Sequence, residues 1–110
     1  MKKKAVFILL VLLLLAVGCS ISVTGNIAAL SARVSAGNSA VTDCEITLEL
    51  QEKVGLIWIT RASWTQSSHS SSLSMNKQYF VTSGKTYRAK AKATVYTASS
   101  TETATKTATP

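Results

Sequence analysis

The segment 45–64 constrains the fold of this chain most strongly, because it alternates apolar and polar residues, turns, and alternates again. Isoleucine and leucine take every second position across 46–50, which is the period of a strand with one buried face. A glycine-containing turn at 53–55 follows, and the returning strand carries both tryptophans, Trp58 and Trp64, at positions of equal parity. The pattern predicts a β-hairpin with both tryptophans on one face. We expect that face to be core, since so small a chain has few other large residues to bury; an exposed platform for stacking carbohydrate is the alternative. Ile57 and Ile59 have the opposite parity, so this is either a central strand or a strand with a bulge.

Short segments with the same period recur along the chain, separated by turns rich in glycine, serine and asparagine. In the most regular segment, 87–96, small apolar residues face one way, and we expect the tryptophans to cover them. No segment after residue 18 has a helical period. The sequence predicts an all-β fold, a small antiparallel Ig-like β-sandwich of about six to seven strands preceded by an N-terminal signal segment. The expected strands are 27–34, 41–52, 56–64, 73–81, 87–96 and 99–106.

Residues 1–18 have the form of an export signal. Three lysines precede the apolar run 5–17, which is shorter than the roughly 20 residues that a membrane-spanning helix needs. We therefore expect a signal peptide at 1–18 and an exported protein, either secreted or anchored to the outer face of the membrane. Residues 19–26 resemble a tether or a frayed first strand, 27–106 form the β-sandwich domain, and 107–110 form a frayed tail.

The two cysteines leave three fates open. Cys19 follows small residues at the end of the apolar run, as in a bacterial lipobox, which makes it a candidate for lipidation. Alternatively, Cys19 forms a disulfide with Cys44, or it is removed with the signal peptide and leaves Cys44 as a lone thiol. We expect Cys44 itself to be a small, half-buried strand residue.

No catalytic or metal-binding pattern is present in the sequence. His69, the only histidine, lies in the serine-rich segment 65–72 without an evident third group to orient it as a catalytic base. The chain has no Cys-x-x-Cys, no acidic cluster with the spacing of a calcium loop, and no glycine-rich phosphate loop. We therefore expect a protein that is not an enzyme and uses no metal or cofactor.

Charge indicates one candidate binding surface. The net charge is +7, and removal of the signal segment with its three lysines leaves +4. Arg88, Lys90 and Lys92 recur about 6.6 Å apart on one strand face, and we expect Lys106 on a neighbouring strand to join them. Such a face suits an anionic cell-envelope polymer, an anionic lipid or an acidic glycan. The competing interpretation is a solvated face, with lysines that prevent aggregation of sheet edges and pair across strands with Glu49 or Glu102. Binding of nucleic acid is disfavoured, because three positive charges without aromatic side chains for base stacking are too few for a nucleic-acid-binding surface.

The polar segment 65–72 offers a second candidate surface, a loop for recognition of a protein partner by a small secreted inhibitor or effector. Its central residues are Gln66, Ser67, Ser68, His69 and Ser70.

Three motifs carry a family resemblance. They are Leu-Gln-Glu-Lys-Val-Gly-Leu-Ile-Trp at 50–58, Ala-Ser-Trp at 62–64, and Tyr-Phe-Val-Thr-Ser-Gly-Lys-Thr-Tyr-Arg-Ala-Lys-Ala at 79–91. Together with the lysine-rich signal segment, they resemble the small secreted, uncharacterised Ig-like β-sandwich proteins of Gram-positive, Clostridia-type bacteria. The resemblance covers about residues 27–106 and implies an Ig-like fold with no established activity.

Overall fold

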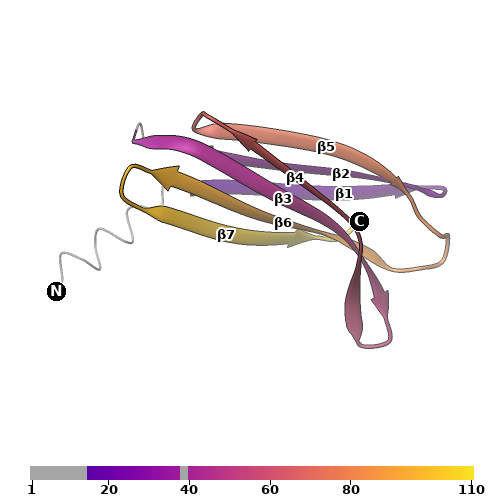
Figure 1. Ribbon diagram of the computed structural model, residues 1–110. Coiled ribbons are helices and arrows are strands. Elements are labelled where there is room, and N and C mark those ends of the chain that lie inside the picture. Colours follow the sequence, from indigo (N-terminus) through magenta and orange to yellow (C-terminus); the bar gives the residue numbers. More distant parts are fainter. Residues whose placement is uncertain (1–14, 38–39) are drawn as a thin grey trace.

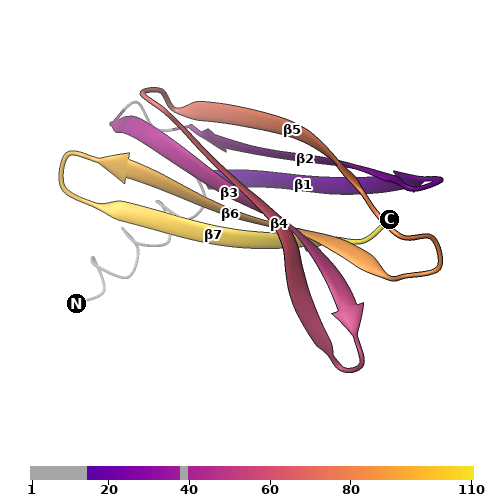
Figure 2. The same ribbon diagram turned by 45° about the vertical axis from the view of Figure 1, so that its right-hand side comes forward.

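The computed structural model describes residues 15–37 and 40–110, which form seven strands in two sheets (Figures 1 and 2). All pairings are antiparallel, with the order β1-β2-β5 in one sheet and β4-β3-β6-β7 in the other. The all-β prediction is therefore confirmed, whereas residues 1–14 of the expected signal segment lie outside the described residues. The described ranges contain no helix that is long and apolar enough to cross a membrane. The strands are β1 (Leu15–Thr24), β2 (Ile27–Ala36), β3 (Val41–Val54), β4 (Ile57–Ser68), β5 (Ser72–Phe80), β6 (Tyr87–Thr97) and β7 (Thr101–Ala108).

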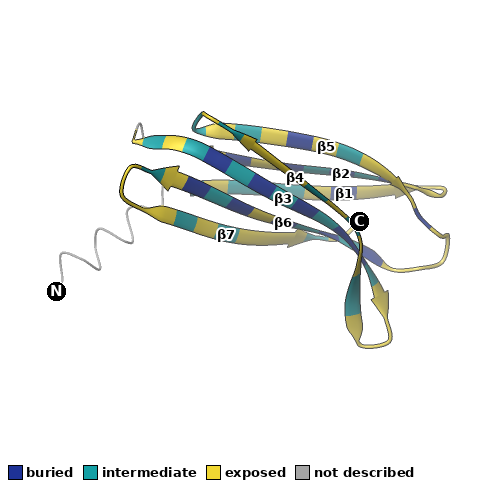
Figure 3. Ribbon diagram, viewed as in Figure 1, coloured by how far each residue is buried: buried dark blue, intermediate teal, exposed yellow. Residues whose placement is uncertain are grey.

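The core lies between the two sheets and takes every second residue of β2, β3 and β6, an alternation visible along β3 and β6 in Figure 3. On β3, Ile46, Leu48 and Leu50 are completely buried, which confirms the predicted apolar face of the central hairpin. On β6 the buried face consists mostly of alanine. Strands β1 and β2 pack across from these alanines, so the tryptophans do not cover them as expected. The buried alanines of β6 are Ala89, Ala91 and Ala93.

A β-bulge in the central hairpin overturns the expectation that both tryptophans share a face. Leu50 pairs with Ala62, but the next residue of β3 pairs with Thr60, so Arg61 is an extra residue in β4. One extra residue reverses the parity of every side chain beyond it, because strand side chains alternate between faces.

The two tryptophans consequently have different surroundings. Trp64 lies opposite Leu48, packs against the core, and meets the ring of Tyr79 edge-on with centroids 6.1 Å apart. Trp58 lies opposite Lys53 on the outer face, where the Arg88 guanidinium stacks 4.3 Å from its ring centroid. The core prediction thus holds for Trp64 alone.

Both ends of the domain are more ordered than expected. Residues 19–26, expected as a tether or a frayed first strand, form most of β1 and its turn, because Leu15, Val17 and Ile21 supply an apolar face that packs against the core. β1 pairs with β2 along its whole length. At the other end β7 continues through Ala108, opposite Ala89, so only the last two residues of the expected tail 107–110 lie outside the sheet.

Tyr87 ties the β5–β6 connection to the sheet. It begins β6, is 5% exposed, and its hydroxyl oxygen accepts a hydrogen bond of 2.9 Å from the backbone N–H of Thr82. The phenol therefore fixes the chain where it crosses from one sheet to the other.

Candidate functional site

The predicted basic residues of β6 do lie on the outer face of the four-stranded sheet, because the alternating alanines point into the core. Lys90 lies between Glu49 of β3 and Thr107 of β7, and Lys92 lies between Thr47 and Thr105. The described residues contain two ion pairs, Arg61–Glu52 and His69–Asp43, and neither involves Lys90 or Lys92. The Glu49 carboxylate nevertheless shares the outer face with Lys90, as its direct cross-strand neighbour.

Arg88 is held in place by its neighbours, unlike the two lysines. Its Nε donates a 2.7 Å hydrogen bond to Oε1 of Gln51, and its guanidinium stacks on Trp58. Gln51 is only 6% exposed, and its amide nitrogen lies 3.3 Å from both Glu49 Oε1 and Thr60 Oγ1. This network orients Arg88 and satisfies the buried amide, so Arg88 contributes a fixed positive charge to the face.

Lys106 does not join this group. It pairs with Ala91, whose side chain points into the core, so Lys106 lies on the inner side of the edge strand β7. The expectation was wrong because the β6–β7 register brings the odd-numbered threonines of β7 to the outer face. We define the cationic face as Arg88, Lys90 and Lys92 with the flanking hydroxyl residues of β3, β4 and β7, which are Thr47, Thr65, Thr103, Thr105 and Thr107. Two carboxylates of β3 border it, Glu49 opposite Lys90 and Glu45 opposite Thr94.

Cys19, the candidate for lipidation, faces inward from the middle of β1, opposite Ala32. Burial raises the pKa of its thiol, and the backbone of Ala91 and the charge of Lys106 partly offset that rise. Burial likewise raises the pKa of Cys44, which is completely buried on β3. Thiols in such surroundings are poor nucleophiles.

The alternative of a Cys19–Cys44 disulfide is not realised, since both thiols are free. Cys19 lies beside Ala91, whereas Cys44 pairs with Val95, four residues further along β6. Four residues of strand correspond to about 13 Å, and a disulfide needs Cα atoms within about 7 Å.

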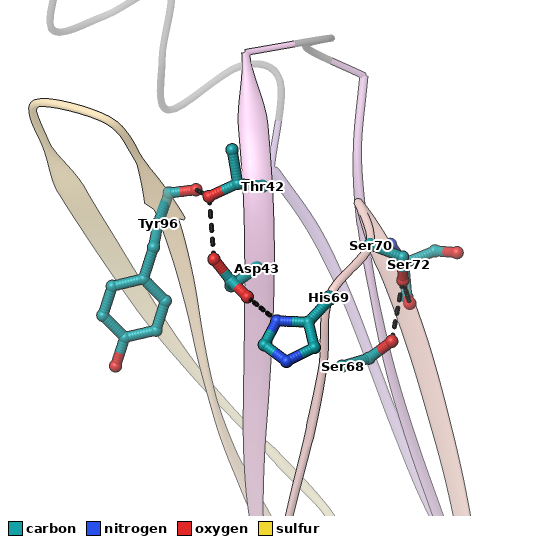
Figure 4. A network of polar contacts seen from close by, with 7 residues as sticks. All are labelled: Thr42, Asp43, Ser68, His69, Ser70, Ser72 and Tyr96. Carbon is teal, nitrogen blue, oxygen red and sulfur yellow. Dashed lines mark hydrogen bonds and ion pairs between the residues drawn. The ribbon is translucent and has the colours of Figure 1, made fainter.

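The predicted recognition loop is much shorter than expected. Gln66, Ser67 and Ser68 belong to β4 and pair with β3, because backbone hydrogen bonding continues through polar residues as readily as through apolar ones. The connection to β5 contracts to 69–71. Ser68 and Ser70 share a hydroxyl hydrogen bond of 3.0 Å, and the Ser70 hydroxyl donates to the carbonyl of Ser72 at 2.6 Å (Figure 4).

His69 has an acidic partner that the sequence analysis missed. Its side chain is 97% exposed, yet Nδ1 contacts Oδ1 of Asp43, and the other carboxylate oxygen accepts a 2.8 Å hydrogen bond from the Thr42 hydroxyl (Figure 4). The β3–β4 register would have revealed the pair, since Cys44 lies opposite Ser68.

A carboxylate on Nδ1 orients a histidine as in hydrolase triads. However, none of the hydrogen bonds in the described part of the chain joins Nε2 to a hydroxyl. The same residues contain no group of three His, Cys, Asp or Glu placed to hold a metal ion. The arrangement therefore fixes the position of an exposed imidazole.

We predict that the Asp43 contacts stabilise the fold only above acidic pH. The Thr42 hydroxyl and then His69 lower the pKa of Asp43 below its ordinary value of 3.8. A carboxyl group with a lowered folded-state pKa contributes stability above its unfolded pKa and loses that contribution as pH falls through the folded value. The midpoint temperature of thermal unfolding should therefore be higher for the wild type than for D43N near neutral pH. The difference between the two midpoints should close as the pH falls below 3.8. E45Q is the control, and a gap that persists in strong acid would contradict the assignment.

Comparisons of the chain with protein-family models, curated protein sequences and solved structures found no match.

Proposed function

We propose that this chain is an exported, non-enzymatic Ig-like β-sandwich that binds an anionic polymer of the cell envelope through the cationic face. The observation that carries the proposal is the placement of Lys90 and Lys92 on the outer face of the sheet, where neither forms an ion pair among the described residues. Lys92 lies between Thr47 and Thr105, and Lys90 lies between Glu49 and Thr107.

Two features support the Ig-like assignment. With the seven strands lettered A, B, C, C′, E, F and G in chain order, leaving out D, the sheets read A-B-E and C′-C-F-G, close to the division of strands in immunoglobulin-type sandwiches. The second is Tyr87 at the start of the sixth strand, whose hydroxyl bonds to the backbone five residues upstream. A tyrosine at this corner is a hallmark of such domains.

Export is supported by the lysines and apolar run of residues 1–18. The resemblance of residues 50–58, 62–64 and 79–91 to secreted Gram-positive proteins favours the same compartment. In that setting an extended polymer with regularly spaced phosphate or carboxylate groups meets Arg88, Lys90 and Lys92 in one row, since residues on one strand face repeat about every 6.6 Å.

The cationic face has a direct test by charge reversal. Lys90→Glu with Lys92→Glu should abolish most binding of the protein to isolated, negatively charged cell wall, and the wild-type interaction should weaken as salt screens it. The matched control, K77E with K106E, makes the same change in net charge outside the cationic face. Lys77 pairs with the buried Leu30 and Lys106 pairs with the buried Ala91, so each lies on the inner side of its strand and neither belongs to that face. If both pairs of variants bind like the wild type in a cosedimentation assay, the cationic face is not the binding surface.

A second candidate function, a secreted inhibitor or effector presenting residues 69–71 to a protein partner, is favoured by one observation. Asp43 holds an almost completely exposed His69 in a fixed position. Binding of this kind should resist salt and disappear in H69A, whereas K90E with K92E should leave it intact. The two variants therefore separate the two functions.

A further inference from the structure

The exposed hydrophobic side chains of the described residues gather toward one end of the sandwich. Seven of the eight lie in or beside the β1–β2 turn, the β3–β4 turn and the β5–β6 connection; only Tyr96 lies toward the other end. Backbone hydrogen bonds join these segments, from Val81 to Asn26 and from Lys53 to Thr86. The seven are Val23, Ile27, Val54, Leu56, Ile57, Tyr79 and Phe80.

The β3–β4 hairpin carries the most exposed of them. β3 pairs with β6 only as far as Glu52, so the last residues of β3 pair with β4 alone. Figures 1 and 2 both show this end of the hairpin swinging away from the two sheets. We call residues 54–58 the tip. Within it Leu56 is 96% exposed, Ile57 61% and Val54 41%.

The turn itself does not require an apolar residue. Gly55 has φ +65° and Leu56 has a negative φ, the pattern of a type II′ turn with glycine first. The β1–β2 turn has the same arrangement, with Gly25 at φ 62° followed by Asn26. A polar residue therefore suits this position, and the fold alone gives no reason for leucine at the tip.

Positive charge surrounds the tip. Lys53 lies opposite Trp58, Arg88 stacks on the same ring, and Arg61 occupies the bulge. Glu52 is paired with Arg61, with 3.4 Å between Nη2 and Oε2, and Glu49 accepts a hydrogen bond from the Gln51 amide that holds Arg88. No acidic residue occurs between Glu52 and Glu102. Asp43 and Glu45 lie at the start of β3, at the far end of the strand. Lys85 directly precedes Thr86, whose carbonyl accepts a hydrogen bond from the Lys53 N–H. We call Lys53, Arg61, Lys85 and Arg88 the basic collar.

We propose that the tip inserts into an anionic lipid surface, with Val54, Leu56 and Ile57 among the acyl chains and the basic collar against the headgroups. Trp58 lies at the base of the tip, where an indole suits the boundary between apolar and polar layers. An apolar projection with a cationic rim is the arrangement by which peripheral proteins bind negatively charged membranes. A narrow tip is poorly suited to a protein partner, because a stable protein interface needs about 800 Å² from each side.

This site is separate from the binding of a polymer proposed above, although Arg88 borders both. Lys90 and Lys92 pair with residues nearer the middle of β3, away from the tip. The two proposals can consequently fail independently.

The test uses the full chain with Trp64→Phe, which leaves Trp58 as the sole tryptophan. The probe is a vesicle of equal parts phosphatidylcholine and phosphatidylglycerol with brominated acyl chains, which quench an inserted indole. We expect these vesicles to quench Trp58 fluorescence. The double variant L56S with I57S should bind them with at least about tenfold weaker apparent affinity, because two apolar side chains no longer enter the bilayer. The unchanged tip should lose a similar affinity for vesicles of phosphatidylcholine alone, which lack the negative charge. Residues 1–18 are the same in every variant, so a difference between variants reports the tip.

Y96S is the matched control, an exposed hydrophobic side chain outside the apolar end, and should bind like its parent. K90E with K92E should keep the quenching even if it loses the polymer. If W64F unfolds the domain, the wild-type chain serves, because Trp64 packs against the core and contributes a constant background. Equal quenching in L56S with I57S, equal quenching by neutral vesicles, or an unquenched Trp58 would overturn the proposal. The proposal would also be overturned by two results together: a dimer in sedimentation that the L56S and I57S substitutions dissociate, and vesicles that leave Trp58 unquenched.

Discussion

Replacing Leu48 by alanine should lower the free energy of unfolding by about 3 kcal/mol, the middle of the range for deleting a buried leucine side chain. Leu48 is completely buried in the central strand, between Trp64 on β4 and Ala91 on β6. The side chain of Ala91 is too short to fill the cavity that the substitution would leave. Because small domains have only about 5–15 kcal/mol of stability, the loss should be plain in urea denaturation.

Leu56 provides the control within the same hairpin. It is 96% exposed, so Leu56→Ala should change the unfolding free energy by no more than about 0.5 kcal/mol. Equal losses for the two variants would mean that the hairpin is not packed as described.

Enlarging Ala91 to leucine should cost about 1–3 kcal/mol, because extra methylenes in a filled core force strained rotamers and shifts of the backbone. Ala91 has no exposed surface, and its backbone lies against the Cys19 thiol of the opposite sheet. The alanines of β6 let the two sheets approach each other, and a longer side chain must separate them. The midpoint of thermal unfolding of A91L, compared with the wild type, measures this cost.

Ala98, exposed in the turn between β6 and β7, gives the corresponding control. A98L adds the same atoms in solvent and should leave the midpoint unchanged. A variant A91L as stable as A98L would show that a void lies over β6 and that the alanines are not close-packed.

Alternation in the sequence was a reliable guide where one face of a strand is buried. It located the hairpin of β3 and β4 and the alanine face of β6, since a period of two leaves only one way to bury the apolar set. It did not locate the bulge at Arg61, because apolar residues of both parities in 56–64 fit a regular central strand as well as a strand with a bulge. The error then passed to Trp58, whose face was wrongly assigned.

The candidate site shows a related limit. The sequence placed Arg88, Lys90 and Lys92 on one face, because they share a strand. Lys106 was misplaced, since its face depends on the register between two strands, which is set by cross-strand pairing and turn geometry. Asp43 was missed for the same reason, as its contact with His69 exists only once β3 and β4 are aligned.

The position of β1 has a consequence for the maturation of the protein. Leu15 to Gly18 pair with Arg33 to Ala36 of β2, and the same residues form the end of the expected signal segment. On the proposed export route, the peptidase and β2 therefore compete for one stretch of chain, and cleavage has to precede strand pairing. A chain cut before Cys19 would leave the end of β2 with free backbone N–H and C=O groups. Such an open edge can accept an added strand from another molecule, so processing would create a docking position that the uncut chain fills with its own residues.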